Sequence, residues 1–138
     1  MYGSLLSWEE IEDIVFILKN SDKDLAFVRT LATFRHAHAE YFLHGRVVRP
    51  PTELVPVPTM SMFGNYNLEV YPACAVPIVV TNTFEAQNGS RVVFAANHDE
   101  SKTVDYVANV EGVGGKTVRV QAKLAPLSVV VLPLVHDM

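Results

Sequence analysis

Histidine offers the widest chemistry in this sequence, because imidazole binds metal ions and transfers protons near neutral pH. His36 and His38 lie two residues apart in a stretch with helical apolar spacing. On a helix this spacing separates the side chains by about 200°, whereas helical metal-binding pairs typically lie four residues apart. In a strand, His36, His38 and Glu40 would share one face and could hold an ion. The surrounding leucine and alanines favour the helix, so we expect no metal site and no cofactor.

The other histidines singled out by their positions are expected to have structural roles. His44 lies near the expected end of the same helix, where imidazole can meet the last carbonyls or the negative end of the helix dipole. His98 and Asp99 are neighbours in a predicted turn, with no identifiable third group or nucleophile. Residues 112–115 do not lead from a strand into a helix, so they predict a hairpin connection rather than a phosphate loop. We therefore predict no catalytic residue.

Hydrolysis of a glycosidic bond requires two carboxyl groups about 5–9.5 Å apart across a cleft. The acids of the N-terminal part instead gather where helices are expected to begin: Glu9, Glu10, Glu12, Asp13, Asp22 and Asp24. There they complement the positive end of the helix dipole. The other acids are scattered over predicted turns and strands, so the pattern predicts no acid pair.

Aromatic side chains could form a platform for sugar rings. The candidates are Trp8, Phe63, Tyr66, Tyr71 and Tyr106. Trp8 falls on a predicted amphipathic helix, where a core position is expected. Tyr66 lies between two asparagines in a predicted loop, which favours exposure. We predict Tyr66 and Tyr71 as ligand-binding residues for carbohydrate.

Composition limits the partners and the size of the fold. A chain of 138 residues can form one domain with a real core but is too short for a large enzyme barrel of about 250 residues. The formal net charge of −4 gives no electrostatic footprint for nucleic acid or an anionic membrane. The apolar runs are far shorter than the roughly 20 residues of a membrane helix. No signal peptide is visible, which leaves the compartment open, and Cys74 is expected to be a buried apolar residue.

The apolar spacing predicts two helices in residues 1–49. The first is expected from Ser7 to about Asn20, with Glu10 completing a capping box. The second is expected from Asp22 to about His44. Gly45 is its predicted stop, because a residue just past a helix end often adopts a left-handed backbone.

The apolar stripe of the second helix is wide and has aromatic residues on more than one side. Such a surface requires a large cover. We predict that Leu31, Phe34 and Phe42 lie in an interface, either with a catalytic barrel domain or with a second copy in a homo-oligomer.

Residues 50–138 have the character of an all-β segment. The four prolines of residues 50–58 predict a crossing segment or an edge. Turn residues, among them Asn88-Gly89-Ser90, separate short β-branched runs. The predicted strands are Met60–Phe63, Leu68–Tyr71, Ala75–Phe84, Arg91–Ala96, Thr103–Val110, Thr117–Val120 and Ser128–Leu134. The expected fold class is α+β, with two N-terminal helices followed by an antiparallel β-sandwich of about seven strands.

Three stretches carry a resemblance: residues 27–46 (FVRTLATFRHAHAEYFLHGR), 91–100 (RVVFAANHDE) and 124–134 (LAPLSVVVLPL). The first resembles the final helix of a large (β/α)8-barrel glycoside hydrolase, which ends in Phe-Leu-x-Gly-Arg and leads to a terminal β-sandwich. The second resembles a sandwich strand that ends in an asparagine turn. The third resembles the last strand, which follows a proline, x, serine corner.

The resemblance implies that any catalytic acids lie in an upstream barrel, because no residue here matches a catalytic position. It favours a non-catalytic C-terminal accessory domain that packs on a barrel or on a second copy through its N-terminal helices. Six or seven βα units of such an enzyme are absent from this chain. The alternatives are a carbohydrate-binding module and a small autonomous glycosidase-related enzyme.

Overall fold

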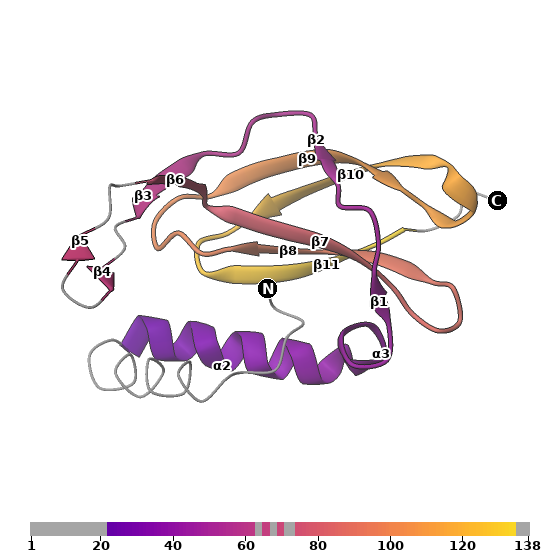
Figure 1. The fold of residues 1–138 in the computed structure, drawn as a ribbon, viewed down its shortest axis with the longest axis horizontal. Helices are drawn as coiled ribbons and strands as arrows, with labels where there is room; N and C mark the ends of the chain where they lie inside the picture. The colour runs from indigo at the N-terminus through magenta and orange to yellow at the C-terminus, as the bar shows by residue number, and fades with distance from the viewer. Residues whose placement is uncertain (1–21, 63–64, 67–68, 71–73, 135–138) are drawn as a thin grey trace.

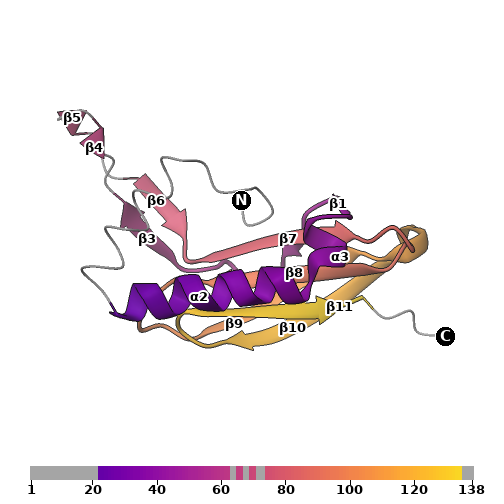
Figure 2. The same cartoon turned by 90° about the horizontal axis from the view of Figure 1, so that it is seen from below.

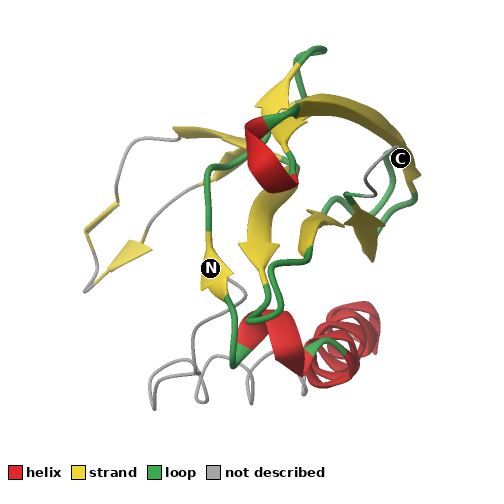
Figure 3. Ribbon diagram, turned by 90° about the vertical axis from the view of Figure 1, so that its right-hand side faces the viewer, coloured by secondary structure: helices red, strands yellow, loops and turns green. Residues whose placement is uncertain are grey.

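The computed structural model describes residues 22–62, 65–66, 69–70 and 74–134. These residues form three layers, with the helices on one side, a four-stranded sheet in the middle and a three-stranded sheet on the far side (Figure 1). Viewed from the side, the α-helices lie together below the strands, and the one helical segment drawn higher up is a 3-10 turn (Figure 3). Helices followed by antiparallel strands confirm the predicted α+β class.

The helical layer consists of α2 (Asp22–Ala37) and the short α3 (Ala39–Phe42). The expected continuous helix breaks at His38, whose carbonyl accepts the N–H groups of both Tyr41 and Phe42 at 3.0 and 3.3 Å. Tertiary contacts explain the break, because it lets both Phe34 and Phe42 reach the same ring in the sheet. The predicted helix from Ser7 to Asn20 lies outside the described residues.

Gly45 is required for a reason different from the predicted one. Its φ is not positive, and the last helix ends earlier, at Phe42. A Cβ atom at this position would lie 2.6 Å from the backbone oxygens of both Glu85 and Tyr41. The chain therefore needs glycine because the turn after α3 presses against the sheet.

The two sheets of the sandwich are antiparallel throughout. Sheet A has the order β1-β7-β8-β11, with β1 (Arg46–Val47), β7 (Val79–Glu85), β8 (Arg91–Asn97) and β11 (Ser128–Pro133). Sheet B has the order β10-β9-β2, with β2 (Thr52–Glu53), β9 (Val104–Glu111) and β10 (Thr117–Leu124). Residues 46–53 cross from the edge of sheet A to the edge of sheet B (Figure 1). This bears out the expected crossing or edge role of the proline-rich stretch.

The predicted turns connect the long strands. Gly89 has φ 85° in the β7–β8 turn, where the Ser90 N–H donates to Asn88 Oδ1 at 3.0 Å. The β9–β10 connection contains a 3-10 turn at Val113–Gly115, as expected of a hairpin. The predicted strand Ala75–Phe84 divides into β6 (Cys74–Pro77) and β7, because the chain changes its partner strand at Ile78. The Ile78 N–H donates to the Pro58 carbonyl next to β3, whereas the Ile78 carbonyl accepts the His98 N–H next to β8.

Two further pairs of strands form a hairpin arm that extends away from the sandwich (Figure 2). Near the body, β3 (Thr59–Met62) pairs with β6, and near the tip β4 (Asn65–Tyr66) pairs with β5 (Glu69–Val70). The strands predicted at Met60–Phe63 and Leu68–Tyr71 correspond to β3 and β5 within the described residues.

The main core lies between the two sheets. Its buried residues are Ile78, Val79, Val93, Ala95, Val104, Tyr106, Ala108, Val110, Val120, Leu124 and Leu134. Strand β8 is buried along almost its whole length, because Val93 and Ala95 face this core while Val92 and Phe94 face the helices. A strand covered on both faces reads as an uninterrupted apolar run, as residues 92–96 do.

Candidate functional site

Asn97 is a fully buried polar residue at the end of β8. Its Nδ2 donates to the carbonyls of Lys102, Leu124 and Ala125 at 2.7, 3.2 and 3.1 Å. Its Oδ1 accepts the Asp99 N–H at 3.0 Å. One side chain thereby joins the end of sheet A to the corner between β10 and β11. All its described partners are backbone groups, so Asn97 has a structural role.

Asp99 and His98 complete this corner. Asp99 Oδ1 accepts the N–H groups of Ser101 and Lys102 at 2.8 and 2.7 Å. These hydrogen bonds, that of Ser101 first, lower the pKa of the Asp99 carboxyl below its usual 3.8. The His98 Nε2 lies 2.8 Å from the Pro77 carbonyl. Asp99 therefore organises the predicted turn, and His98 contacts the backbone next to it.

An aromatic cluster joins the helices to the outer face of sheet A. Phe42 stacks on Phe94 with ring centroids 4.5 Å apart, and Phe34 meets the same ring edge-on at 5.1 Å. His38 lies 5.5 Å from Phe94 and 4.6 Å from Phe34, so its ring also belongs to the cluster. This packing places His38 among rings, whereas His36 is exposed.

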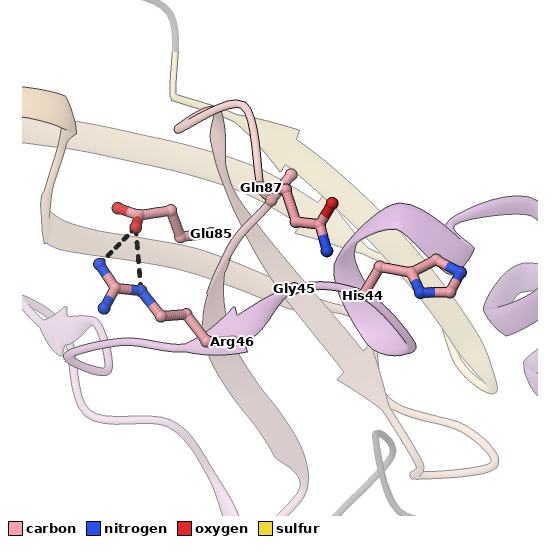
Figure 4. Close-up of a pocket in the computed structure, with 6 residues that line it drawn as sticks. His44, Gly45, Arg46, Glu85 and Gln87 are labelled. Carbon is pink, nitrogen blue, oxygen red and sulfur yellow. Dashed lines mark hydrogen bonds and ion pairs between the residues drawn. The ribbon is translucent and has the colours of Figure 1, made fainter.

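An open pocket of about 290 Å³ lies where the helical layer meets the β7–β8 turn. It is lined by His44, Gly45, Arg46, Glu85, Ala86 and Gln87. Figure 4 shows Arg46 and Glu85 directed toward one another, while the His44 imidazole points away from both. The volume falls at the lower limit of ordinary ligand sites, which are usually enclosed and mostly apolar.

Two arginines hold the single carboxylate of this pocket. Arg46 donates Nε and Nη2 to Glu85 Oε1 at 3.0 and 2.6 Å. Arg91 donates Nε to Glu85 Oε2 at 2.6 Å, and its Nη1 donates to the backbone oxygens of Glu111 and Gly112. The hydrogen bonds from Arg91 and then Arg46 lower the pKa of the Glu85 carboxyl below its usual 4.5.

The lowered pKa makes Glu85 unsuited to act as a general acid at neutral pH. A general acid needs a raised pKa, whereas Glu85 is held ionised. No second carboxylate lines the pocket among the described residues. Within the same residues, no group of three or more His, Cys, Asp or Glu side chains could hold a metal ion. The site is therefore an ion-pair network that ties β1, β7, β8 and the β9–β10 connection together.

His44 departs from its expected role at the helix end. Its side chain is exposed in the pocket and makes no hydrogen bond within the described part of the chain. The reason is that α3 ends at Phe42, so His44 already lies in the turn toward β1.

The predicted aromatic platform is not assembled by the described residues. Tyr106 is only 1% exposed, and burial raises the pKa of its hydroxyl. Tyr66 lies in β4 near the tip of the hairpin arm, but the structure describes its backbone and not its side chain. Tyr71, Trp8 and Phe63 are also outside the described residues. Carbohydrate binding by Tyr66 and Tyr71 therefore stays a prediction.

The three residues predicted for an interface lie on the helical layer and are half-buried. Phe34 and Phe42 contact the rings of sheet A within the same chain, and Leu31 lies one turn before Phe34 on α2. Phe34 and Phe42 are therefore packed against sheet A of their own chain. An interface through Leu31, Phe34 and Phe42 stays a prediction.

The ion-pair network is the feature that sequence reasoning missed. Arg46 and Glu85 are 39 residues apart, and Glu85 is separated from Arg91 by a hairpin turn. Only the β7–β8 turn gives a signal, because Asn88-Gly89 makes Glu85 and Arg91 direct cross-strand partners. Nothing in the local pattern indicates that β1 pairs with β7.

Comparison with family models, curated proteins and solved structures gave no match to this chain. Neither α2 nor α3 has the length and apolarity to cross a bilayer, and these are the helices of the described residues.

Proposed function

We propose that this chain is a non-catalytic accessory β-sandwich domain of a glycoside hydrolase-like protein, and that it packs on a catalytic barrel or, when isolated, on a second copy. The proposal has two supports besides the resemblance. One is the chemistry of the pocket, where two arginines pair with Glu85 and hold its carboxylate ionised, which does not suit a general acid. The other, which carries the proposal, is the distribution of exposed apolar side chains.

The exposed large apolar residues of the described chain lie in residues 43–55, which we call the edge segment. They are Leu43, Val47, Leu54 and Val55, with exposed fractions of 54, 60, 46 and 51%. Single exposed apolar residues are common, whereas their accumulation in one segment is typical of a contact surface. The edge segment runs along one margin of both sheets, from α3 past β1 to β2 (Figure 1).

Two of the stretches that carry the resemblance lie side by side in the fold. The stretch 91–100 contains β8 and the asparagine turn, and the stretch 124–134 contains the proline, x, serine corner and β11. The two stretches meet where Asn97 donates to the carbonyls of Leu124 and Ala125.

A carbohydrate-binding module is less well supported. Every aromatic side chain whose exposure is described is buried or half-buried. The outer face of sheet B carries polar and charged residues instead of a planar aromatic surface. Only Tyr66 and Tyr71 keep that alternative open.

Two experiments test the proposed function. The purified chain is assayed against a panel of chromogenic glycosides, and we expect no turnover; turnover that the Glu85→Gln variant abolishes would contradict a non-catalytic role. The coding sequence directly upstream is also read. Barrel-coding sequence there would support the proposal, and coding sequence without βα units would contradict it.

A further inference from the structure

Sheet B ends in a long strand with an open side. Strand β10 has eight residues and pairs only with β9 among the described residues. It lies at an outer margin of the described part of the molecule (Figure 2), and within that part no strand of sheet B pairs with its second edge. It contains no proline, and its pairing with β9 from Thr117 to Leu124 has no bulge, so neither device blocks this edge.

The register identifies the backbone groups that face the free edge. Gly112 donates its N–H to the Lys116 carbonyl at 2.7 Å, just before the ladder that pairs Thr117 with Glu111. In an antiparallel ladder, hydrogen-bonded pairs alternate with pairs whose N–H and C=O groups point away from the partner strand. The outward groups therefore belong to the alternating residues Thr117, Arg119, Gln121 and Lys123.

The same edge is cationic. Lys116, Arg119 and Lys123 are exposed and make no ion pair within the described chain, and β10 contains no acid. The acids next to this edge lie on the neighbouring strand β9, where Asp105 is opposite Lys123 and Glu111 is opposite Thr117. Glu111 already lies 3.8 Å from Arg91.

This pattern disfavours a second copy as the occupant. Antiparallel pairing of β10 with itself about Gln121 would place Arg119 opposite Lys123 of the other copy. Like charges directly opposite each other destabilise a sheet. An RNA or DNA strand would meet the cations, but it offers no alternating row of N–H and C=O groups for the backbone.

We propose that the free edge of β10 binds an extended, acidic segment of a partner polypeptide as a fourth antiparallel strand of sheet B. The backbone groups at positions 117, 119, 121 and 123 pair with the added strand. Two acids four residues apart in that strand lie opposite Arg119 and Lys123. This surface is independent of the proposed function, because the edge segment contains β2, which forms the opposite margin of sheet B.

The test uses the blocked heptapeptide TEVTVET, whose glutamates are four residues apart. Titration followed by amide NMR shifts should perturb residues 117–123 most strongly. The peptide TKVTVKT tests the contribution of charge. A version of TEVTVET that is methylated on the backbone nitrogens of both glutamates and of the central threonine, which face β10, tests the main-chain pairing. We expect both control peptides to bind at least roughly tenfold more weakly.

Two protein variants separate strand pairing from general attraction. Gln121→Pro removes an outward N–H that the fold does not use, since proline is tolerated at such edge positions. It should weaken binding roughly tenfold relative to Gln121→Ala. The double variant Arg119→Glu/Lys123→Glu should bind TKVTVKT in preference to TEVTVET. Thermal melting checks that each variant is folded, and the double variant keeps the test decisive if Gln121→Pro does not fold.

Three results would overturn the proposal. The first is the absence of shifts at residues 117–123 with millimolar peptide. The second is equal binding of the acidic and basic peptides, or of Gln121→Pro and Gln121→Ala. The third is binding of oligothymidylate at this edge in place of TEVTVET, which would indicate a nucleic acid site.

Discussion

The ring of Phe42 in α3 stacks on the ring of Phe94 in β8, with centroids 4.5 Å apart and an interplanar angle of 27°. Phe94 also contacts the rings of Phe34, Tyr41 and Phe84. It is therefore the centre of the contact between the helical layer and sheet A. The helices are held by the sandwich of their own chain, which leaves the edge segment as the apolar surface without a described cover.

Phe94→Ala should destabilise the fold strongly. The ring is 6% exposed, so truncation leaves a cavity beneath both helices. We expect a loss of about 3–5 kcal/mol in the free energy of unfolding, measured by urea denaturation. Leu43→Ala, at a 54% exposed position, should change it by less than about 0.5 kcal/mol. Equal losses would contradict the assignment of Phe94 to the core.

Asn97→Ala should also destabilise, through hydrogen bonds rather than through volume. The substitution removes the Nδ2 donor from the carbonyls of Lys102, Leu124 and Ala125. Each buried group left unsatisfied costs about 1–3 kcal/mol.

The matched control is Asn109→Ala in β9, where the side chain makes no hydrogen bond within the described residues. Its effect should stay within about 0.5 kcal/mol. If Asn109→Ala lost as much free energy of unfolding as Asn97→Ala in the same urea titration, the structural role of the buried Asn97 amide would be contradicted.

Acid sensitivity should depend on Glu85. Because Arg91 and Arg46 lower its pKa in the folded protein, the unfolded chain binds more protons as the pH falls below the ordinary value of 4.5. The stabilisation is complete above that pH and is lost as the pH falls through the folded pKa. We expect the urea midpoint of Glu85→Gln to fall less than that of wild type between neutral pH and about pH 3.

The control is Glu100→Gln, an exposed position without an ion pair in the described part of the chain. It should retain the acid response of wild type. Asp99, whose pKa is also lowered, should keep a residual response in both variants. Identical acid responses of Glu85→Gln and wild type would contradict the network.

Gly45→Ala should destabilise by about 1–3 kcal/mol, because the new Cβ meets backbone atoms that cannot move independently. Gly112→Ala is the milder comparison, since its closest contact is the Val118 side chain at 2.9 Å. Thermal denaturation compares the two. A larger loss at Gly112 would mean that the turn after α3 is not pressed against sheet A.

The long strands β8, β9 and β11 and the first half of β10 could be predicted because asparagine, glycine or proline turns separate β-branched runs. The prediction Thr117–Val120 stops four residues before the observed end of β10 at Leu124. The strands β1 and β2 could not, since two residues carry no periodicity and pair only through long-range contacts. The break at His38 escapes prediction for the same reason, because the rings beneath α2 and α3 determine it. Asn97 could be located as a turn residue, but two of its three carbonyl partners, Leu124 and Ala125, are brought to it by the corner between β10 and β11.

The central claim is that the edge segment is a contact surface of a non-catalytic domain. Sedimentation velocity of the isolated chain tests it most directly, with the double variant Leu54→Lys/Val55→Lys as comparison. The account predicts that wild type associates as its concentration rises, and that the variant stays monomeric with an unchanged circular dichroism melt. A wild-type chain that remains monomeric over a wide concentration range, or a variant that associates equally well, would contradict it.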